Sequence, residues 1–106
     1  MLFNGELMSV AKEACYLTDS ASSEEIARLK SIVEDAVIKI AHLLGLPEDF
    51  DFSTPSIARP IFKNYVFYAW NDVAEEFEGR YLSDITQVQD YYKVYGSKAD
   101  AKKQES

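Results

Sequence analysis

The pattern of hydrophobic and polar positions is most regular between residues 23 and 44. Apolar side chains recur there every three or four residues along one stripe, which is the spacing of a helix with a single buried face. Ser22 and Glu25 match a capping box at the start of this stretch. Gly45 suits the left-handed conformation that closes a helix, and Pro47 prevents continuation. We therefore predict a helix over residues 23–44.

Residues 60–78 form the second strong pattern. Pro60 fits a first helical turn, where its missing N–H costs no hydrogen bond. The stretch is apolar on most of its sides, so we expect a helix that is covered over a wide arc and ends at Gly79. Shorter helical patterns cover about residues 5–17 and residues 83–95.

The last predicted helix has Ser83 in the N-cap position, and Gly96 ends it. The residues that follow include no large apolar side chain, so we expect residues 97–106 to be a flexible polar tail. No stretch alternates hydrophobic and polar residues with a period of two. The whole pattern predicts one all-α domain over residues 1–96, with four helices of which the second and third are dominant and antiparallel.

Composition and charge narrow the classes of partner. The chain has 106 residues, of which 47% are hydrophobic and 27% charged, as in ordinary globular domains. Its 18 acidic and 11 basic residues give a net charge of −7. Nucleic acids and anionic membranes attract basic surfaces, so we expect neither as a partner. The single cysteine and the absence of a basic region before Glu6 predict a protein of a reducing compartment without a signal peptide.

Residues that carry enzyme chemistry are scarce. His42 is the only histidine and Cys15 the only cysteine, which excludes a zinc site of the usual composition. We expect a buried, inert thiol at Cys15, and at His42 a favourable position near the end of its helix. The sequence contains no glycine-rich phosphate loop and no Gly-x-Ser-x-Gly motif. We expect no catalytic residues, no cofactor and no metal ion.

Two groups of residues are candidates for contacts with other molecules. Glu75, Glu76 and Glu78 form an acidic stretch, for which a solvated face is the default interpretation and a face that repels DNA phosphates the alternative. Aromatic residues make up 13% of the chain, and those of its second half are numerous for so small a core. We assign the following aromatic residues to the core or to a subunit interface: Tyr65, Phe67, Tyr68, Trp70, Tyr91 and Tyr95.

The order of these segments matches a known family. The chain contains Ser-Ser-Glu-Glu-Ile-Ala-Arg-Leu-Lys-Ser-Ile-Val-Glu-Asp-Ala and then Leu-Leu-Gly-Leu-Pro. After a loop come Lys-Asn-Tyr-Val-Phe-Tyr-Ala-Trp-Asn-Asp-Val-Ala-Glu-Glu-Phe-Glu and Tyr-Leu-Ser-Asp-Ile. Over about residues 6–95, and most of all from Asn64 to Ile85, the sequence resembles the head–tail connector proteins of long-tailed double-stranded DNA bacteriophages, which are also called adaptor or head-completion proteins.

The resemblance implies a small helical virion protein without enzymatic activity, made in the cytoplasm of the bacterial host. Members of the family form a ring under the portal of the DNA-filled capsid. The ring is expected to be a dodecamer in the virion. The isolated protein is expected to be a monomer or an oligomer with another number of subunits. The ring extends the DNA channel and joins the head to the stopper or tail-completion proteins. The C-terminal segment typically reaches the portal, and by position it corresponds here to Gly96, Ser97, Lys98, Lys102 and Lys103.

Two other classes of function stay open. An acidic helical inhibitor or DNA mimic would occupy a nucleic-acid-binding enzyme, but the charges of this chain are scattered and form no regular stripe. A small dimeric regulatory domain would be supported by a basic recognition helix, and the sequence has none. Native mass measurements with and without a portal ring distinguish the three classes.

Overall fold

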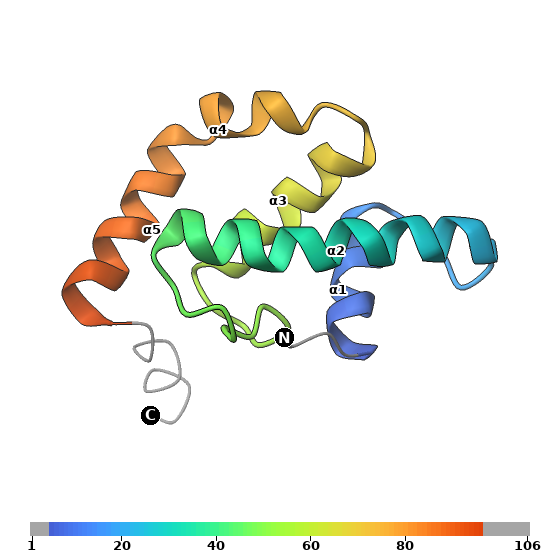
Figure 1. The fold of residues 1–106 in the computed structure, drawn as a ribbon, viewed down its shortest axis with the longest axis horizontal. Coiled ribbons are helices and arrows are strands. Elements are labelled where there is room, and N and C mark those ends of the chain that lie inside the picture. The colour runs from blue at the N-terminus through green and yellow to red at the C-terminus, as the bar shows by residue number, and fades with distance from the viewer. Residues whose placement is uncertain (1–4, 97–106) are drawn as a thin grey trace.

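The computed structural model describes residues 5–96, and all regular secondary structure within them is helical (Figure 1). The predicted all-α class is therefore confirmed. In chain order the elements are α1 (Gly5–Ala14), α2 (Ser23–Leu44), α3 (Arg59–Trp70), the 3-10 helix η1 (Ala74–Glu76), α4 (Phe77–Arg80) and α5 (Leu82–Tyr95).

The longest helix, α2, is the central element of the molecule. It begins with the predicted capping box: the Glu25 N–H donates to Ser22 Oγ at 3.1 Å, and the Ser22 N–H donates to Glu25 Oε1 at 2.9 Å. It ends at Gly45, whose φ of 71° is the left-handed conformation that glycine adopts without steric cost. In Figure 1 the N-terminal turns of α2 extend beyond the other helices.

The remaining helices pack around α2. Both α1 and α3 contact it and each other, and α3 runs back across it obliquely in the opposite general direction (Figure 1). The chain then turns through η1 and α4 into α5, so that α3, α4 and α5 outline an arch. Gln89 of α5 donates to the Leu43 carbonyl oxygen at 2.8 Å, and this hydrogen bond connects α5 to the last turn of α2.

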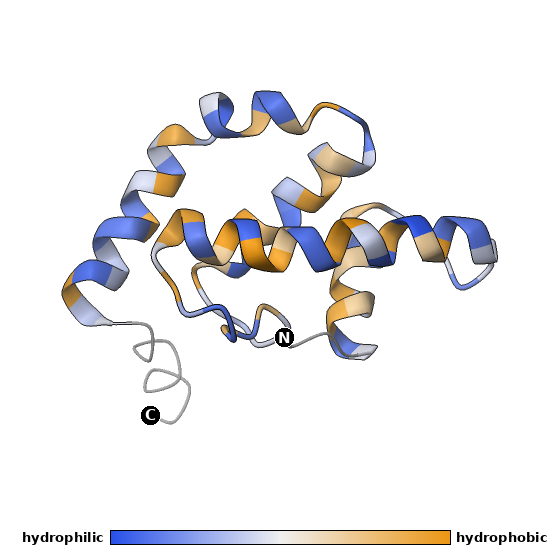
Figure 2. Cartoon of the chain, viewed as in Figure 1, coloured by the Kyte–Doolittle hydropathy of each residue, from blue (hydrophilic) through white to orange (hydrophobic). Residues whose placement is uncertain are grey.

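The core lies where α1, α2 and α3 meet, and it continues under α5. Hydrophobic residues occur on α2 chiefly where it passes the other helices, whereas its first turns are mostly hydrophilic (Figure 2). Phe52, in the loop before α3, stacks on Phe62 of α3 with ring centroids 4.7 Å apart. The largest fully buried side chains are Phe52, Phe62, Phe77, Leu7, Leu29, Ile40, Val33, Val37 and Val66.

The predicted helix over residues 60–78 is wrong in its second half. α3 ends at Trp70, and a turn at residues 71–73 separates it from η1 and α4. Asp72 has a left-handed backbone with φ of 61°, which interrupts an α-helix and which a short polar residue tolerates. The apolar pattern continues beyond this turn because the ring of Phe77 is fully buried in the core. The described residues thus contain five α-helices instead of four.

Two other helix boundaries differ from the prediction. α1 ends at Ala14, three residues earlier than expected. α5 begins at Leu82 with Tyr81 in the N-cap position, so Ser83 lies inside the helix and does not cap it. No side-chain hydrogen bond from Tyr81 caps the start of α5.

The two predicted glycine stops have different outcomes. Gly96 ends α5, as predicted, with φ of 82°. Gly79 lies within the short helix α4 and ends no long helix. Of the predicted portal-contact residues only Gly96 is described. The other four lie outside the described residues, as does the whole predicted tail over residues 97–106: Ser97, Lys98, Lys102 and Lys103.

Candidate interaction surface

An aromatic cluster centred on Phe77 fills the arch where α4 meets α3. The Phe77 ring stacks on Tyr81 with centroids 5.0 Å apart, and it meets Tyr65 and Tyr68 edge-on at 5.3 and 5.9 Å. Such pairs add about 0.5–1.5 kcal/mol each beyond the area that they bury. The cluster holds η1, α4 and the start of α5 against α3, so the arch is a packed part of the fold.

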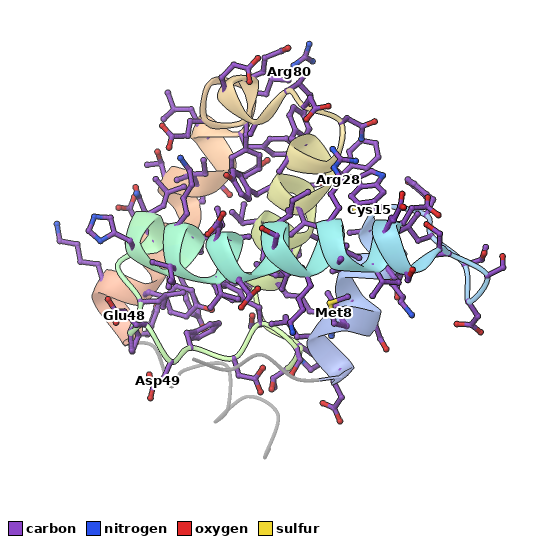
Figure 3. All side chains as sticks on the ribbon, turned by 45° about the vertical axis from the view of Figure 1, so that its right-hand side comes forward. Met8, Cys15, Arg28, Glu48, Asp49 and Arg80 are labelled. Carbon is purple, nitrogen blue, oxygen red and sulfur yellow. The ribbon has the colours of Figure 1, made fainter. Side chains whose placement is uncertain are left out.

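Arg28 on α2 contacts the end of α3 and the turn that follows it. An Arg28 Nη atom donates to the Trp70 carbonyl oxygen at 2.6 Å, and the guanidinium carbon lies 4.3 Å from the centre of the Trp70 ring. The same nitrogen lies 3.4 Å from a carboxylate oxygen of Asp72. Figure 3 shows Arg28 reaching from α2 toward the end of α3. One side chain thus satisfies a terminal carbonyl of α3 and holds the residue that interrupts the helix.

The six predicted aromatic residues are divided between the core and the surface. Phe67 is 36% exposed and Tyr95 67% exposed. Of the six, these two are therefore the most accessible to another molecule. The other four are half-buried and pack against the core: Tyr65, Tyr68, Trp70 and Tyr91.

Exposed apolar residues also occur outside the six predicted aromatic positions. Tyr16, just after α1, is 82% exposed, and its ring meets Phe67 edge-on at 5.8 Å. Its φ of 60° turns the chain sharply out of the predicted helix. Leu82 and Val94 of α5 are exposed as well. The helical pattern did not reveal Tyr16, because the predicted first helix included this position.

Three surface hollows meet at Asn64, in the middle of α3. One of about 470 Å³ lies between α3 and α5, and another of about 460 Å³ lies between α3 and α1, with Tyr16 in its wall. The third has a volume of about 400 Å³, and its only charged residues are Arg59 and Lys63. We call it the basic hollow, and it is lined by Pro55, Ser56, Arg59, Pro60, Lys63 and Asn64.

The predicted acidic residues lie together on η1 and α4, at the outer edge of the arch. Glu75, Glu76 and Glu78 are exposed, and we call these three the acidic corner. Glu76 pairs with Arg80 and Glu78 with Lys39, each at 3.8 Å. Exposed pairs of this length contribute little to stability, because solvent screens them. Figure 3 shows Arg80 pointing away from the body of the molecule. Like Arg80, the three glutamates of the acidic corner are exposed to solvent.

The cysteine and the histidine occupy different environments. Cys15 is buried, with its Sγ 3.9 Å from the Val66 carbonyl oxygen, and burial raises the pKa of its thiol to about 11. His42 is exposed in the last turn of α2. Within residues 5–96 no three histidine, cysteine or carboxylate side chains lie close enough to hold a metal ion.

Two carboxylates have lowered pKa values because of their partners. A hydrogen bond from Lys63 at 2.8 Å, together with the lysine charge, lowers the pKa of Glu13. At Asp51 partial burial acts to raise the pKa, but hydrogen bonds from Ser53 and Thr54 outweigh it and lower the pKa. Both groups serve the fold: Glu13 connects α1 to α3, and Asp51 shapes the loop before α3.

The helices of residues 5–96 include none that is long and apolar enough to cross a membrane. Comparisons of the chain with protein-family models, with curated proteins and with solved structures found no match.

Proposed function

We propose that this protein is a structural component of a tailed bacteriophage virion, a connector without catalytic activity that forms a ring under the portal. In that position it extends the DNA channel and joins the DNA-filled head to the stopper or tail-completion proteins. The observation that carries the proposal is the segment from Asn64 to Ile85, in which an aromatic helix, an acidic stretch and a further helix occur in the order of the head–tail connector family.

The distribution of charge supports this proposal. Residues 5–96 include 16 acidic and 8 basic side chains, which gives the described part a net charge of −8. A surface that lines a DNA channel must let phosphates pass without binding them. Acidic residues do so because they forfeit the release of counterions that drives DNA binding.

The unlike surfaces of the subunit also support it. A closed ring with a single rotation axis requires each subunit to present two different patches, one to each neighbour. The basic hollow lies at the first turn of α3, whereas the acidic corner lies beyond its last turn. A subunit with such a pair of patches is suited to head-to-tail association.

The proposal is tested in the phage whose genome encodes the chain. We expect labelled antibody to mark one site per particle, at the head–tail junction. A nonsense mutation in the gene should yield DNA-filled heads that contain portal but carry no tails. Intact tailed particles from the mutant, or virions that lack the protein, would overturn the proposal.

The predicted contact of the C-terminal segment with the portal has its own test. Removing residues 97–106 should weaken docking to the purified portal ring encoded by the same genome. The helical content and melting temperature of the free protein should change little, because within residues 5–96 the core is already continuous from Leu7 to Tyr92. Equal docking of the full and shortened chains would remove the portal role of this segment.

A further inference from the structure

The two oppositely charged patches lie at opposite ends of α3. We infer that the basic hollow of one subunit receives the acidic corner of a second copy of this chain, so that subunits associate head to tail. This inference rests on the proposed ring function and adds to it the two surfaces that meet. The occupant is a second copy because the chain itself carries the patch of complementary charge.

The basic hollow has the shape and charge of a receiving surface. It is a concavity of about 400 Å³ between the loop before α3 and the first two turns of that helix, and Arg59 and Lys63 are its only charged residues. Lys63 already contacts Glu13 at 2.8 Å. The direct hydrogen bond to Glu13 comes from Lys63, and the charge of Arg59 also acts on Glu13 and helps to lower its pKa. We expect Arg59 to provide most of the attraction, and Lys63 to exchange its exposed intramolecular partner for one on the neighbouring subunit.

The acidic corner has the properties of an entering surface. Its three carboxylates are exposed on η1 and α4 at the edge of the arch, and the rings of the Phe77 cluster pack behind them. Leu82 comes four residues after Glu78 in the chain and is 63% exposed, which offers an apolar contact in addition to the charges. The pairs with Arg80 and Lys39 are both 3.8 Å long, so a neighbouring subunit displaces them at little cost.

Heterologous contact follows from this arrangement. A two-fold dimer pairs unlike patches only where both fall within one interface, whereas the hollow lies at the start of α3 and the acidic corner beyond its end. Net charge opposes association between copies, but salt screens that repulsion beyond about 8 Å at physiological ionic strength. Close pairs between unlike patches are screened less and determine the register of the contact.

Charge reversal with complementation tests the contact. The hollow-reversed variant is Arg59→Glu with Lys63→Glu, and the corner-reversed variant is Glu75→Lys with Glu76→Lys. We expect sedimentation velocity to show self-association of the wild-type chain that increases with concentration. Each variant alone should bind its own kind more than about tenfold more weakly, because like charges then face each other. An equimolar mixture of the two variants should restore association, because each offers the patch that the other needs.

Matched controls separate the contact from changes in net charge or folding. Glu48→Lys with Asp90→Lys raises the net charge by the same amount as the corner-reversed variant, at exposed positions outside both patches. This control should associate at least as well as the wild type. Circular dichroism and thermal melting of every variant verify that the fold is retained.

The inference is overturned if the wild-type chain stays monomeric at all concentrations, if either reversed variant associates like the wild type, or if the mixture does not recover. Fluorescence anisotropy with a short DNA duplex provides a further test, because DNA binding that the hollow reversal abolishes would assign this surface to phosphate. Docking of the wild-type chain to the portal ring is measured separately. Docking without self-association refutes this contact and leaves the proposed function standing, whereas self-association without docking refutes the proposed function.

Discussion

At the scale of single residues, the fully buried ring of Phe62 makes a close contact in the core. Its side chain is fully buried and lies parallel to the ring of Phe52 at 4.7 Å, which connects α3 to the loop before it. Phe62→Ala removes this stack and leaves a cavity. We expect the free energy of unfolding to fall by about 3–5 kcal/mol, measured by urea denaturation.

Phe67→Ala is the matched control for this substitution. Phe67 lies on the same helix but is 36% exposed, so its truncation should cost much less than that of Phe62. Equal losses for the two variants would contradict the burial of Phe62 in the structure.

The buried thiol of Cys15 predicts a dependence of stability on pH. Burial raises its pKa from the ordinary value of 9.0 to about 11. The unfolded chain therefore loses this proton at a lower pH than the folded chain does. The contribution of the thiol to stability is complete below pH 9 and is lost as the pH rises toward 11.

A comparison with Cys15→Ala isolates this contribution from the other groups that titrate at high pH. The difference in the free energy of unfolding between wild type and variant should be constant below pH 9 and should decrease toward pH 11. A difference that does not change over this interval would show that the folded chain leaves the thiol open to water.

At the scale of helices, the turn at residues 71–73 shows where the sequence pattern is insufficient. Helical periodicity continues from Ile61 to Phe77, and it correctly predicts that both side chains are buried. Periodicity reports which residues reach the core, but it does not report whether the path between them is straight. The adjacent Asn71 and Asp72 were the available signal, because both favour the ends of helices over their interiors.

The capping residues of α2 explain why its boundaries were predicted correctly. Ser22, Glu25 and Gly45 act through local hydrogen bonds and backbone conformation, which the sequence specifies directly. The end of α3 depends instead on Arg28, a residue 42 positions from Trp70 in the chain. A contact of that kind follows from tertiary packing and leaves no pattern in the sequence of either segment.

Arg28→Ala tests whether this contact holds the turn after α3. The substitution removes a charged hydrogen bond to the Trp70 carbonyl and the guanidinium on its ring, so we expect a loss of about 1 kcal/mol in the free energy of unfolding. Amide hydrogen exchange should become faster at residues 71–76. Because Trp70 is the only tryptophan, its fluorescence reports on the same contact directly.

Two further variants test whether the effect is specific to the guanidinium group of Arg28. Lys93→Ala removes an exposed cation elsewhere and should leave the tryptophan emission unchanged. Arg28→Lys keeps the charge but lacks the planar guanidinium, so it should recover only part of the loss. Emission and exchange rates that match the wild type in Arg28→Ala would show that the Phe77 cluster alone holds the turn.

At the scale of the whole molecule, one part of the candidate surface corresponds to a pattern in the sequence and the other part does not. The acidic residues are exposed, as a solvated face requires. The basic hollow was not foreseen, because the loop before α3 and the helix itself form it together. Arg59 and Lys63 lie four positions apart on one helix, but nothing in that spacing indicates the concavity between them and Pro55.

The acidic charge of the molecule predicts that it does not hold duplex DNA. Non-specific DNA-binding proteins have dissociation constants of about 10⁻⁴ to 10⁻⁶ M at physiological salt, and that affinity comes from basic side chains that displace counterions. This chain has a net charge of −7, so we expect no binding in that range by fluorescence anisotropy. Reversing Glu75, Glu76 and Glu78 to lysine changes the net charge by six, to −1, and places four basic residues, Arg80 among them, on one corner. We expect this variant to gain weak DNA binding that decreases as salt increases, because the new lysines release counterions where the carboxylates could not. If the wild-type chain binds DNA as well as this variant does, then its acidic residues do not keep phosphates away, and the electrostatic argument for a DNA channel loses its basis.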